Sequence, residues 1–357
     1  MKLFIAAGGT GGHIFPGISV AEAFLEQDKN NQVVFIGTTT GLEGTIVPAY
    51  GFRLVYIEAR QFLGKGVAYK IFTLLHVLQG IRQGISLIKQ EKPDAILGMG
   101  GFTSVPIIIA GLLLGIPRFL HEQNVKPGLA NRLLSRFSTS TFISFEVTKE
   151  YLKKRNNVYH TGNPLRKKIT TERKEKSQDT FGIFVFGGSR GATRINESVL
   201  TLLPFLESYK NTIMYHQTGN EDFRRVKEAY EKTRVKYEVF PFTNEMAKYY
   251  NLSDVVICRA GASTIFELAF FKKAAILIPY PFSAGGHQWH NASLVERIGG
   301  GYVINNDEAT GDRLYSILKQ LMDNPALLHT MGENIATLYV DNAAQRIVGH
   351  IYDKTGK

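Results

Sequence analysis

The sequence predicts an α/β protein made of two doubly wound, parallel-sheet domains that face each other across a cleft. Three observations support this fold class. Short apolar runs of strand length alternate with longer segments of helical pattern along the chain. Many of the runs end in glycine-rich turns, and the same scheme starts again in the second half. Such alternation is typical of parallel sheets with helices on both faces.

The expected strands can be read off in order. In the first half they are KLFIAAGG, QVVFIGT, FRLVYIEA, DAILGMGG, PRFLHEQN and STSTFISF, with helices expected between them, for example over 17–27 and 68–90. The second half contains TFGIFVFGG, NTIMYHQTG, YEVFPF, DVVICRAGAS, AAILIPYP and GGYVIN. The ligand of such a pair of Rossmann-like domains is expected between them.

A basic, polar stretch over 163–179 separates the two halves and is the natural linker. We therefore expect an N-terminal domain over 1–162 and a C-terminal domain over 163–340. The last segment, 341–357, has a helical pattern and is expected to pack back on the first domain. A chain of 357 residues is long enough for two such cores.

Composition excludes several classes of protein. The single cysteine, Cys258, rules out a disulfide framework and a cysteine-rich metal site. The apolar run in MKLFIAAGG is too short for a signal peptide, and the most apolar segment, 105–117, is too short to span a bilayer. We therefore expect a cytosolic protein that does not cross a membrane.

The net charge of +11 is compatible with nucleic acid, an anionic membrane surface or phosphorylated substrates as partners. The basic runs YLKKRNN and PLRKKITTERKEK are interpreted as solvated linker. No nucleic-acid-binding motif accompanies them, so no nucleic-acid partner is expected.

The first glycine turn, GGTGGH over 8–13, suits an anionic ligand that carries a diphosphate. Glycine lets main-chain N–H groups approach phosphate oxygens, and a helix that begins there adds partial positive charge. The turn is no dinucleotide fingerprint, because Ile14 stands where a glycine is required. His13 falls in the first helical turn, where the helix dipole favours the neutral imidazole that a general base needs. A capping or packing role for His13 is equally compatible with this position.

Further polar loops follow other strands. GMGGFTSVP is a second glycine loop, and HEQN over 121–124 forms the rim of a pocket rather than core. Ser189 in GGSRG either caps a helix or touches a phosphate. Thr264 and Glu267 in CRAGASTIFE form either a capping box or a site with phosphate on the amides and a ribose on the carboxylate.

No Asp-x-Asp pair and no cluster with metal-ligand spacing occurs in the sequence. We therefore expect neither a metal nor another cofactor. The charge of a diphosphate would be met by helix N-termini and by arginine, for which Arg166 and Arg259 lie in suitable loops.

Taken together, GGTGGHIFPG, GGFTSVP, HEQN, GNPLR, GGSRGA, CRAGASTIFE and HQWHNA resemble the ordered motif set of the MurG family of bacterial glycosyltransferases. The resemblance implies a two-domain GT-B fold, with UDP-N-acetylglucosamine held mainly by the C-terminal domain. It implies inverting, metal-independent transfer of N-acetylglucosamine to the 4-hydroxyl of the muramyl sugar of lipid I. The product, lipid II, serves peptidoglycan synthesis, and the enzyme would lie on the cytoplasmic face of the bacterial membrane.

The same resemblance assigns site residues by motif. His13 becomes the favoured general base, with Glu122 as the alternative. Contacts to the donor sugar, its diphosphate or the acceptor's diphosphate are implied for Thr10, Gly11, Gly12, Asn124, Arg166, Ser189 and Gln288. A main-chain contact to uracil is expected at Thr243. The diphosphate and, through the last carboxylate, the ribose are expected on Ala262, Ser263, Thr264, Ile265, Phe266 and Glu267.

A lipid acceptor also offers an explanation for the basic charge. The segment 65–83 mixes apolar and cationic side chains, namely Ile71, Phe72, Leu75 and Leu78 with Lys65, Lys70 and Arg82. Such a patch suits docking on an anionic inner leaflet, although an ordinary half-buried helix has the same pattern. Cell-wall-synthesis proteins are further implied partners.

Two alternatives remain at this point. One is another two-domain sugar-nucleotide enzyme, such as a UDP-N-acetylglucosamine 2-epimerase or a small-molecule glycosyltransferase, which HEQN together with GGTGGH disfavours. The other is a non-catalytic scaffold on a membrane surface, which leaves the glycine loops without a role.

Overall fold

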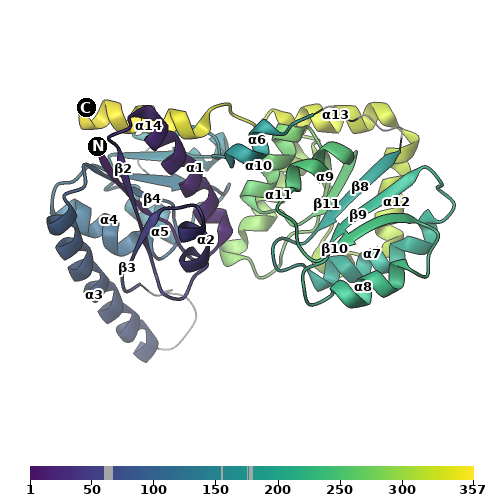
Figure 1. The fold of residues 1–357 in the computed structure, drawn as a ribbon, viewed down its shortest axis with the longest axis horizontal. Helices are drawn as coiled ribbons and strands as arrows, with labels where there is room; N and C mark the ends of the chain where they lie inside the picture. Colours follow the sequence, from purple (N-terminus) through teal and green to yellow (C-terminus); the bar gives the residue numbers. More distant parts are fainter. Residues whose placement is uncertain (60–66, 154–155, 175, 177–179) are drawn as a thin grey trace. The chain divides into compact units, whose positions relative to one another are not determined.

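The computed structural model of the chain describes residues 1–59, 67–153, 156–174, 176 and 180–357, without the side chains of 67–74 (Figure 1). The chain forms two compact units. The N-terminal unit is Met1–Arg166 with Val340–Lys357, and the C-terminal unit is Lys167–Tyr339. The sequence analysis placed the first boundary after residue 162. Each unit is described by itself below.

The N-terminal sheet has seven parallel strands in the order β3-β2-β1-β4-β5-β6-β7. Their bounds are β1 (Lys2–Ala6), β2 (Gln32–Gly37), β3 (Arg53–Tyr56), β4 (Ala95–Gly98), β5 (Arg118–Glu122), β6 (Ser140–Ile143) and β7 (Val158–His160). Strand β1 pairs with both β2 and β4. The strand order therefore reverses beside β1, which is the point where open α/β sheets bind ligands.

Successive side chains of β1 point to opposite faces of the sheet, so this strand contributes to both hydrophobic cores of the unit. Leu3 and Ile5 face α1 (Gly11–Gln27) and α14 (Ala343–Thr355), whereas Phe4 and Ala6 face α3 (Val67–Glu91) and α4 (Ser104–Leu113). All four strand residues are fully buried. The remaining helices of the unit are α2 (Glu43–Ala49), α5 (Leu129–Leu134) and the 3₁₀ helix η1 (Glu146–Tyr151).

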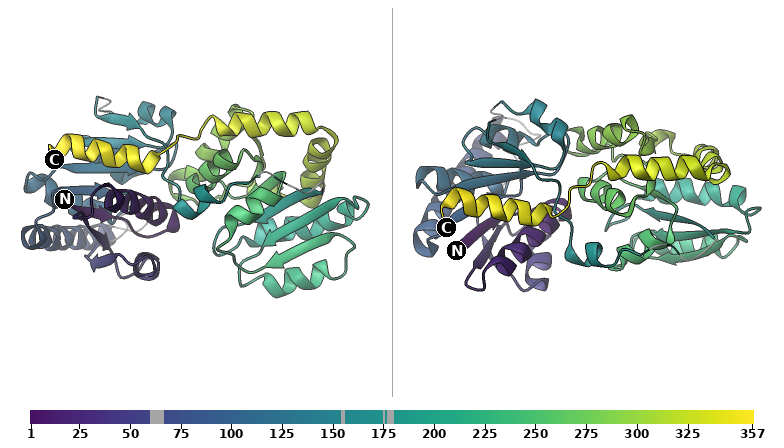
Figure 2. Two further views of the ribbon diagram at one scale, coloured as in Figure 1. Left: turned by 45° about the horizontal axis from the view of Figure 1, so that its top comes forward. Right: turned by 90° about the horizontal axis from the view of Figure 1, so that it is seen from above.

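The C-terminal helix α14 returns to the N-terminal unit, where it packs against α1 (Figure 2). Ile347 and Ile351 are fully buried in the core beside β1. The Tyr352 ring lies 5.8 Å from that of Phe24, and its hydroxyl meets Asn31 Nδ2 at 2.6 Å. The last residues of the chain are therefore part of the first domain.

The C-terminal sheet has six parallel strands in the order β10-β9-β8-β11-β12-β13. They are β8 (Phe181–Phe186), β9 (Thr212–Gln217), β10 (Lys236–Phe240), β11 (Val255–Cys258), β12 (Ala274–Leu277) and β13 (Gly301–Val303). The helices are α6 (Lys167–Thr171), α7 (Thr193–Leu206), α8 (Phe223–Tyr230), α9 (Met246–Leu252), α10 (Ala262–Phe271), α11 (His287–Arg297), α12 (Gly311–Asp323) and α13 (Pro325–Ala336), with 3₁₀ turns η2 (Ala284–Gly286) and η3 (Asn306–Glu308).

The two faces of this sheet are filled differently. Ile183 and Val185 of β8 pack in an aliphatic core with residues of α7 and α12. The opposite face carries Phe184 and Phe186, whose rings contact that of Tyr250 on α9. The strand order reverses beside β8, which pairs with β9 and β11. The glycine loops after β8 and β11 therefore flank the equivalent ligand position in this unit.

Some local expectations were wrong. Helix α1 begins at Gly11 rather than at residue 17 and contains Pro16. Strand β7 was not predicted, because its three residues carry no clear alternation. The expected linker over 163–179 contains the short helix α6. Among the described helices, none combines the length and the apolar character needed to cross a membrane.

Candidate active site

His13 is the third residue of α1 and lies over the glycine loop that follows β4. Its Nδ1 lies 3.3 Å from Gly8 O. Because a carbonyl oxygen can only accept, this contact puts the proton of the neutral ring on Nδ1 and the lone pair on Nε2. Gly100 and Gly101 adopt φ values of +93° and +73°, and a Cβ on either would lie 3.5 Å from the imidazole. A Cβ at that distance would be in ordinary van der Waals contact with the ring, so it is the positive φ values of this loop that favour glycine.

The first glycine turn is held by a carboxylate that the sequence analysis missed. Glu43, fully buried on α2, accepts from Gly9 N at 3.0 Å. Its other oxygen accepts from the amide and the hydroxyl of Thr38, each at 2.8 Å. Glu43 therefore ties the loop after β1 to the loop after β2. The sequence signal was an acidic residue in the first turn of a helix after a glycine, which is common and unspecific.

Thr10, Gly11 and Gly12 lie where α1 begins. Thr10 is the N-cap residue, with φ −130° and ψ 158°, and makes no side-chain cap hydrogen bond in the part of the chain described. The first-turn amides of a helix have no intrahelical acceptors, so they can bind an anion. Arg166 lies in the same unit, with its guanidinium carbon 4.7 Å from the centre of the Phe15 ring.

Glu122 ends β5 and is almost completely buried. Its Oε1 accepts from the main-chain amide of Asn124 at 2.9 Å and from that residue's Nδ2 at 3.2 Å. Its Oε2 accepts from Gly128 N at 3.1 Å and from Asn131 Nδ2 at 2.9 Å. Both oxygens of the carboxylate thus hold the HEQN loop together, and Asn124 is positioned by one of them.

His121, at the same strand end, is fully buried. Burial lowers the pKa of His121 to about 4. The nearby His13 contributes to this decrease, whereas the hydrogen bond to Gly162 O opposes it. His121 is therefore neutral at physiological pH. In the C-terminal unit, burial lowers the pKa of His216 to about 3, although the negative charge of Asp222 acts to raise that pKa.

The helix α10 begins at the glycine loop after β11, where the sequence analysis expected a diphosphate. Its N-cap is Gly261, and no side-chain cap is recorded in the described residues, so the Thr264–Glu267 capping box was wrong. Ser263 Oγ is buried and has no hydrogen-bond partner within the described ranges. The amides of Ala262, Ser263 and Thr264 lie in the first turn, where a helix has no intrahelical acceptors for them.

The rest of the predicted 262–267 segment is turned into the core. Ile265 and Phe266 are fully buried, and Ile265 N already donates to Gly261 O at 3.0 Å. Their side chains are therefore not available to a nucleotide. Glu267 is 7% exposed, and its Oε2 accepts from the Tyr250 hydroxyl at 2.9 Å.

The loops after β11 and β12 are joined by two long side chains. Gln288 Oε1 accepts from Ala260 N at 3.2 Å and from Tyr280 N at 2.9 Å, which leaves its Nε2 as the atom suited to a sugar hydroxyl. Arg259 Nη1 donates to Ile278 O, Pro279 O and Asn306 Oδ1. Arg259 thus anchors these loops, whereas the sequence analysis assigned it to a diphosphate.

Ser189 and Thr243 lie in two loops that a third residue connects. Gln217, buried at the end of β9, donates from Nε2 to Gly188 O at 3.1 Å and accepts from Thr243 N at 3.1 Å. The Thr243 amide is therefore already bonded, so a main-chain contact to uracil would use its carbonyl. Ser189 itself is exposed. Sequence analysis missed Gln217, a polar residue at the end of a strand.

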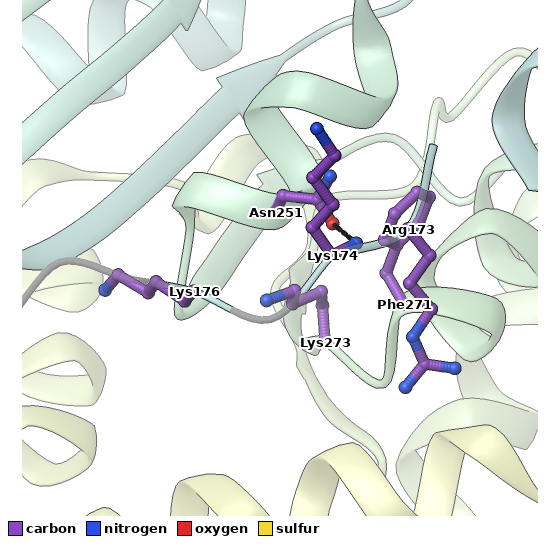
Figure 3. Close-up of a pocket in the computed structure, with 6 residues that line it drawn as sticks. All are labelled: Arg173, Lys174, Lys176, Asn251, Phe271 and Lys273. Carbon is purple, nitrogen blue, oxygen red and sulfur yellow. Dashed lines mark hydrogen bonds between the residues drawn. The ribbon is translucent and has the colours of Figure 1, made fainter. Parts of the chain in front are cut away.

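A cavity of about 440 Å³ in the C-terminal unit lies away from these loops (Figure 3). It is lined by Arg173, Lys174, Lys176, Asn251, Phe271 and Lys273. Lys176 pairs with Asp254, and Lys273 donates to Ser253 O at 2.7 Å. Burial, opposed by Asp254, lowers the pKa of Lys273 to about 8. Lys273 and Asp254 directly precede β12 and β11, so the cavity lies at the amino edge of the sheet, opposite the glycine loops.

Comparison with known proteins agrees with this architecture. Residues 3–143 match the glycosyltransferase family 28 N-terminal domain, and residues 182–347 match the family 28 C-terminal domain. A relative from Citrifermentans bemidjiense is 41% identical over 358 residues, which is 99% of this chain and 100% of that protein. It is named UDP-N-acetylglucosamine--N-acetylmuramyl-(pentapeptide) pyrophosphoryl-undecaprenol N-acetylglucosamine transferase.

Solved structures agree as well. The crystal structure of Acinetobacter baumannii MurG matches with a TM-score of 0.81 and 29% identity over 99% of each chain. A UDP-GlcNAc 2-epimerase from Neisseria meningitidis, bound to UDP-GlcNAc, has a TM-score of 0.69 at 14% identity over 99% of this chain and 100% of that one, so it is similar in fold alone. The predicted GT-B class of two parallel-sheet domains is confirmed. The chain belongs to glycosyltransferase family 28 and, within it, to the MurG family.

Proposed function

We propose that this protein transfers N-acetylglucosamine from UDP-N-acetylglucosamine to the 4-hydroxyl of the muramyl sugar of lipid I, giving lipid II. The observation that carries the proposal is the 41% identity, over the full length of both chains, to a protein named for this reaction. The predicted motifs also lie at the carboxyl edges of the two sheets, where α/β folds bind nucleotides.

The donor's diphosphate is proposed to bind at the N-terminus of α10. First-turn amides and the helix dipole stabilise negative charge there, and Ser263 Oγ is a buried hydroxyl without a partner in the described part of the unit. Gln288 Nε2 would donate to a hydroxyl of the sugar. With the charge met in this way, transfer would need no divalent metal.

For the chemical step we propose a single displacement. The 4-oxygen of the acceptor sugar attacks the anomeric carbon as the bond to the β-phosphate oxygen breaks, so UDP leaves and the configuration inverts. His13 Nε2 takes the proton of the attacking hydroxyl. Glu122 is the less suitable base, because both of its oxygens already accept hydrogen bonds from the HEQN loop.

The acceptor's lipid is proposed to bring the N-terminal unit to the cytoplasmic face of the membrane. Leu75 and Leu78 are exposed on α3, Leu113 at the end of α4, and Leu129 and Leu133 on α5. These helices pack in the order α3, α4, α5, so the exposed leucines lie on neighbouring elements. Arg132 and Arg136 line a cavity of about 300 Å³ beside Leu133. Lys65 and the side chains of Lys70, Ile71 and Phe72 lie outside the described residues.

The membrane contact is tested by sedimentation with vesicles that contain or lack anionic phospholipid. The double variant Leu75→Ser/Leu78→Ser should bind anionic vesicles about 10-fold more weakly, because two apolar side chains no longer insert. Leu25→Ser, an exposed leucine on α1, is the matched control and should bind like the unmodified protein. Equal binding of both variants would reject the contact through α3.

The reaction is tested by incubating the protein with radiolabelled UDP-N-acetylglucosamine and a lipid I analogue, with and without EDTA. Label should pass to the lipid equally well in both arms. Absence of transfer in both arms would refute the proposed reaction. Loss of transfer in the EDTA arm alone would refute only its independence of metal.

A further inference from the structure

A chain of buried hydrogen bonds behind His13 begins at Gly162. His121 Nε2 lies 3.2 Å from Gly162 O, which can only accept, so this nitrogen carries the proton of the neutral ring. His121 Nδ1 is therefore an acceptor. Gln123 Nε2 lies 2.9 Å from it and donates to it.

These contacts determine which way the Gln123 amide points. Its Nε2 also donates to Met99 O at 2.9 Å, so both of its hydrogens are used. A flipped amide would place an oxygen against two acceptors. Gln123 Oε1 is therefore directed away from both, and it is buried without a hydrogen-bond partner among the residues that the structure describes.

The unpartnered oxygen and the imidazole of His13 both lie next to Gly100. A Cβ placed on Gly100 would be 3.6 Å from Gln123 Oε1 and 3.5 Å from His13 Nε2, so the two atoms flank the same glycine. The same point is 3.1 Å from Asn131 Nδ2, whose own Oδ1 is a second buried acceptor without a partner in the described ranges. The neutral His13 ring has its only N–H on Nδ1, toward Gly8 O.

We propose that Gln123 is a positioning residue of the transfer reaction, which stabilises the imidazolium that His13 becomes when it takes the acceptor's proton. Gln123 Oε1 is turned away from Met99 O and His121 Nδ1, beside the same glycine as His13 Nε2, and a carbonyl oxygen there interacts more favourably with a cation than with the neutral base. A buried acceptor without a partner costs free energy in the resting enzyme. That cost is offset when a donor or a positive charge forms beside it. This inference rests on the proposed function and on His13 as its base.

The first test compares Gln123→Met, which has nearly the same shape but lacks the dipole, with the unmodified enzyme. We expect kcat to fall about 10-fold, with an unchanged KM for UDP-N-acetylglucosamine. The acidic limb of the pH profile of kcat/KM should move to lower pH. Gln123→Glu adds a negative charge and should move that limb to higher pH; because its second oxygen replaces the donor to Met99 O and His121 Nδ1, its melting temperature is measured alongside. Charged and titratable groups around this loop are His121 and Glu122 on β5, Glu43 on α2 and Arg166 beside Phe15, and all remain in both variants.

A double-mutant cycle separates this role from simple support of the fold. If Gln123 acts through His13, Gln123→Met should have almost no effect on the residual rate of His13→Ala. The matched control is Asn157→Leu, which removes another buried amide of the same unit that donates to Ser138 O. It should lower the melting temperature and leave the pH profile in place.

The outcomes are distinguishable. If the unmodified enzyme transfers no sugar, the proposed function has failed. If it is active and Gln123→Met slows it equally with and without His13, or if both Gln123 variants move the acidic limb in the same direction, the role of Gln123 is refuted. Either variant alone decides the direction of the shift, so one folded variant is sufficient.

Discussion

The six strands of the C-terminal sheet follow the same order as the first six of the N-terminal sheet, but the two units build the ligand edge from different parts. In the N-terminal unit, side chains with titratable or amide groups are buried at the end of β5, namely His121, Glu122 and Gln123, and are fixed by hydrogen bonds. In the C-terminal unit the corresponding strand, β12, ends in the apolar residues Ile276 and Leu277, and the ligand edge is formed by glycine loops and the first turn of α10, which Gln217 and Gln288 hold in place. The same scaffold can therefore support proton transfer in one unit and anion binding in the other.

This difference has a physical basis. A general base needs one defined tautomer and a fixed orientation, which buried and hydrogen-bonded neighbours help to provide. A diphosphate needs several donors that approach closely, and main-chain amides at a helix N-terminus supply them without side-chain entropy cost. The predictions below test this division of work, in order of decreasing effect.

The largest effect is expected for His13→Ala. Loss of the base should lower kcat for transfer about 100- to 10,000-fold, while the Kd for UDP-N-acetylglucosamine stays the same, because the main donor contacts are proposed in the other unit. Steady-state rates and calorimetric titration measure the two quantities. The control is His329→Ala on α13, whose imidazole is largely exposed. A His13→Ala enzyme that works at nearly the normal rate would mean that His13 is not the base.

Both units should lose stability in acid because each buries a neutral histidine. The pKa values of His121 and His216 are about 4 and about 3 in the folded chain, below the unfolded value near 6.5. Below pH 6.5 the unfolded chain therefore binds protons that the folded chain does not. The free energy of unfolding consequently decreases as the pH is lowered from 6.5 to about 4. Between pH 6.5 and 5 the loss is about 2 kcal/mol for each histidine.

Urea unfolding at several pH values measures this loss. His216→Asn, which cannot be protonated, should have a flatter pH dependence in the transition of the C-terminal unit. A stability that is the same at pH 7 and pH 5 would mean that neither histidine stays neutral in the folded chain.

Gly191→Ala tests the dependence of the C-terminal unit on its main chain. Gly191 has φ +80°, and an added Cβ would lie 2.1 Å from Thr218 O. The loop after β8 must then shift, which should cost about 2 kcal/mol of stability and weaken donor binding. Gly349→Ala on α14 is the control, because nothing lies within 4 Å of its added Cβ, and it should be neutral or slightly stabilising. Thermal melts and donor titrations measure the two effects. Equal melting temperatures and equal donor affinities of the two variants would contradict the proposed role of Gly191.

The smallest effect is expected for Ser263→Ala. Removal of one hydroxyl donor should raise the KM for UDP-N-acetylglucosamine about 5-fold with little change in melting temperature, because Ser263 Oγ has no partner among the described residues to lose. Ser198→Ala in the same unit is the control and should instead lower the melting temperature without changing the KM. Its hydroxyl hydrogen is shared between two carbonyl oxygens within hydrogen-bond distance, Arg194 O and Ala309 O, so that variant should lose stability and keep its KM. A Ser263→Ala enzyme with unchanged KM would place the diphosphate elsewhere.

Much of the architecture could be predicted from local patterns. Strand β8 follows from the run FGIFVF, and helix α3 was expected over 68–90 and lies at Val67–Glu91. The period of apolar residues is set by residues close together in the sequence, so it can be recognised without knowledge of the fold. Strand β7 was missed for the same reason, since three residues are too few to establish a period.

The site was predicted less completely. His13 and the helix start at residue 262 follow from glycine turns after strands, which are local signals. Glu43 and Gln217 were missed, because each holds two loops that are distant in the sequence. Of the two interpretations of Thr264 and Glu267, the capping box was wrong, because the helix has Gly261 as its N-cap, and Glu267 bonds to Tyr250 on another helix.

The sequence by itself determined where the strands and glycine turns lie, because side-chain alternation and the freedom of glycine are properties of a few consecutive residues. Only the tertiary structure decided which polar groups are consumed in holding loops and which remain for a ligand. It placed both oxygens of Glu122 in the HEQN loop and left the oxygen of Gln123 without a described partner. The reason is that a hydrogen bond needs two groups within about 3 Å, and which groups meet depends on contacts between distant segments.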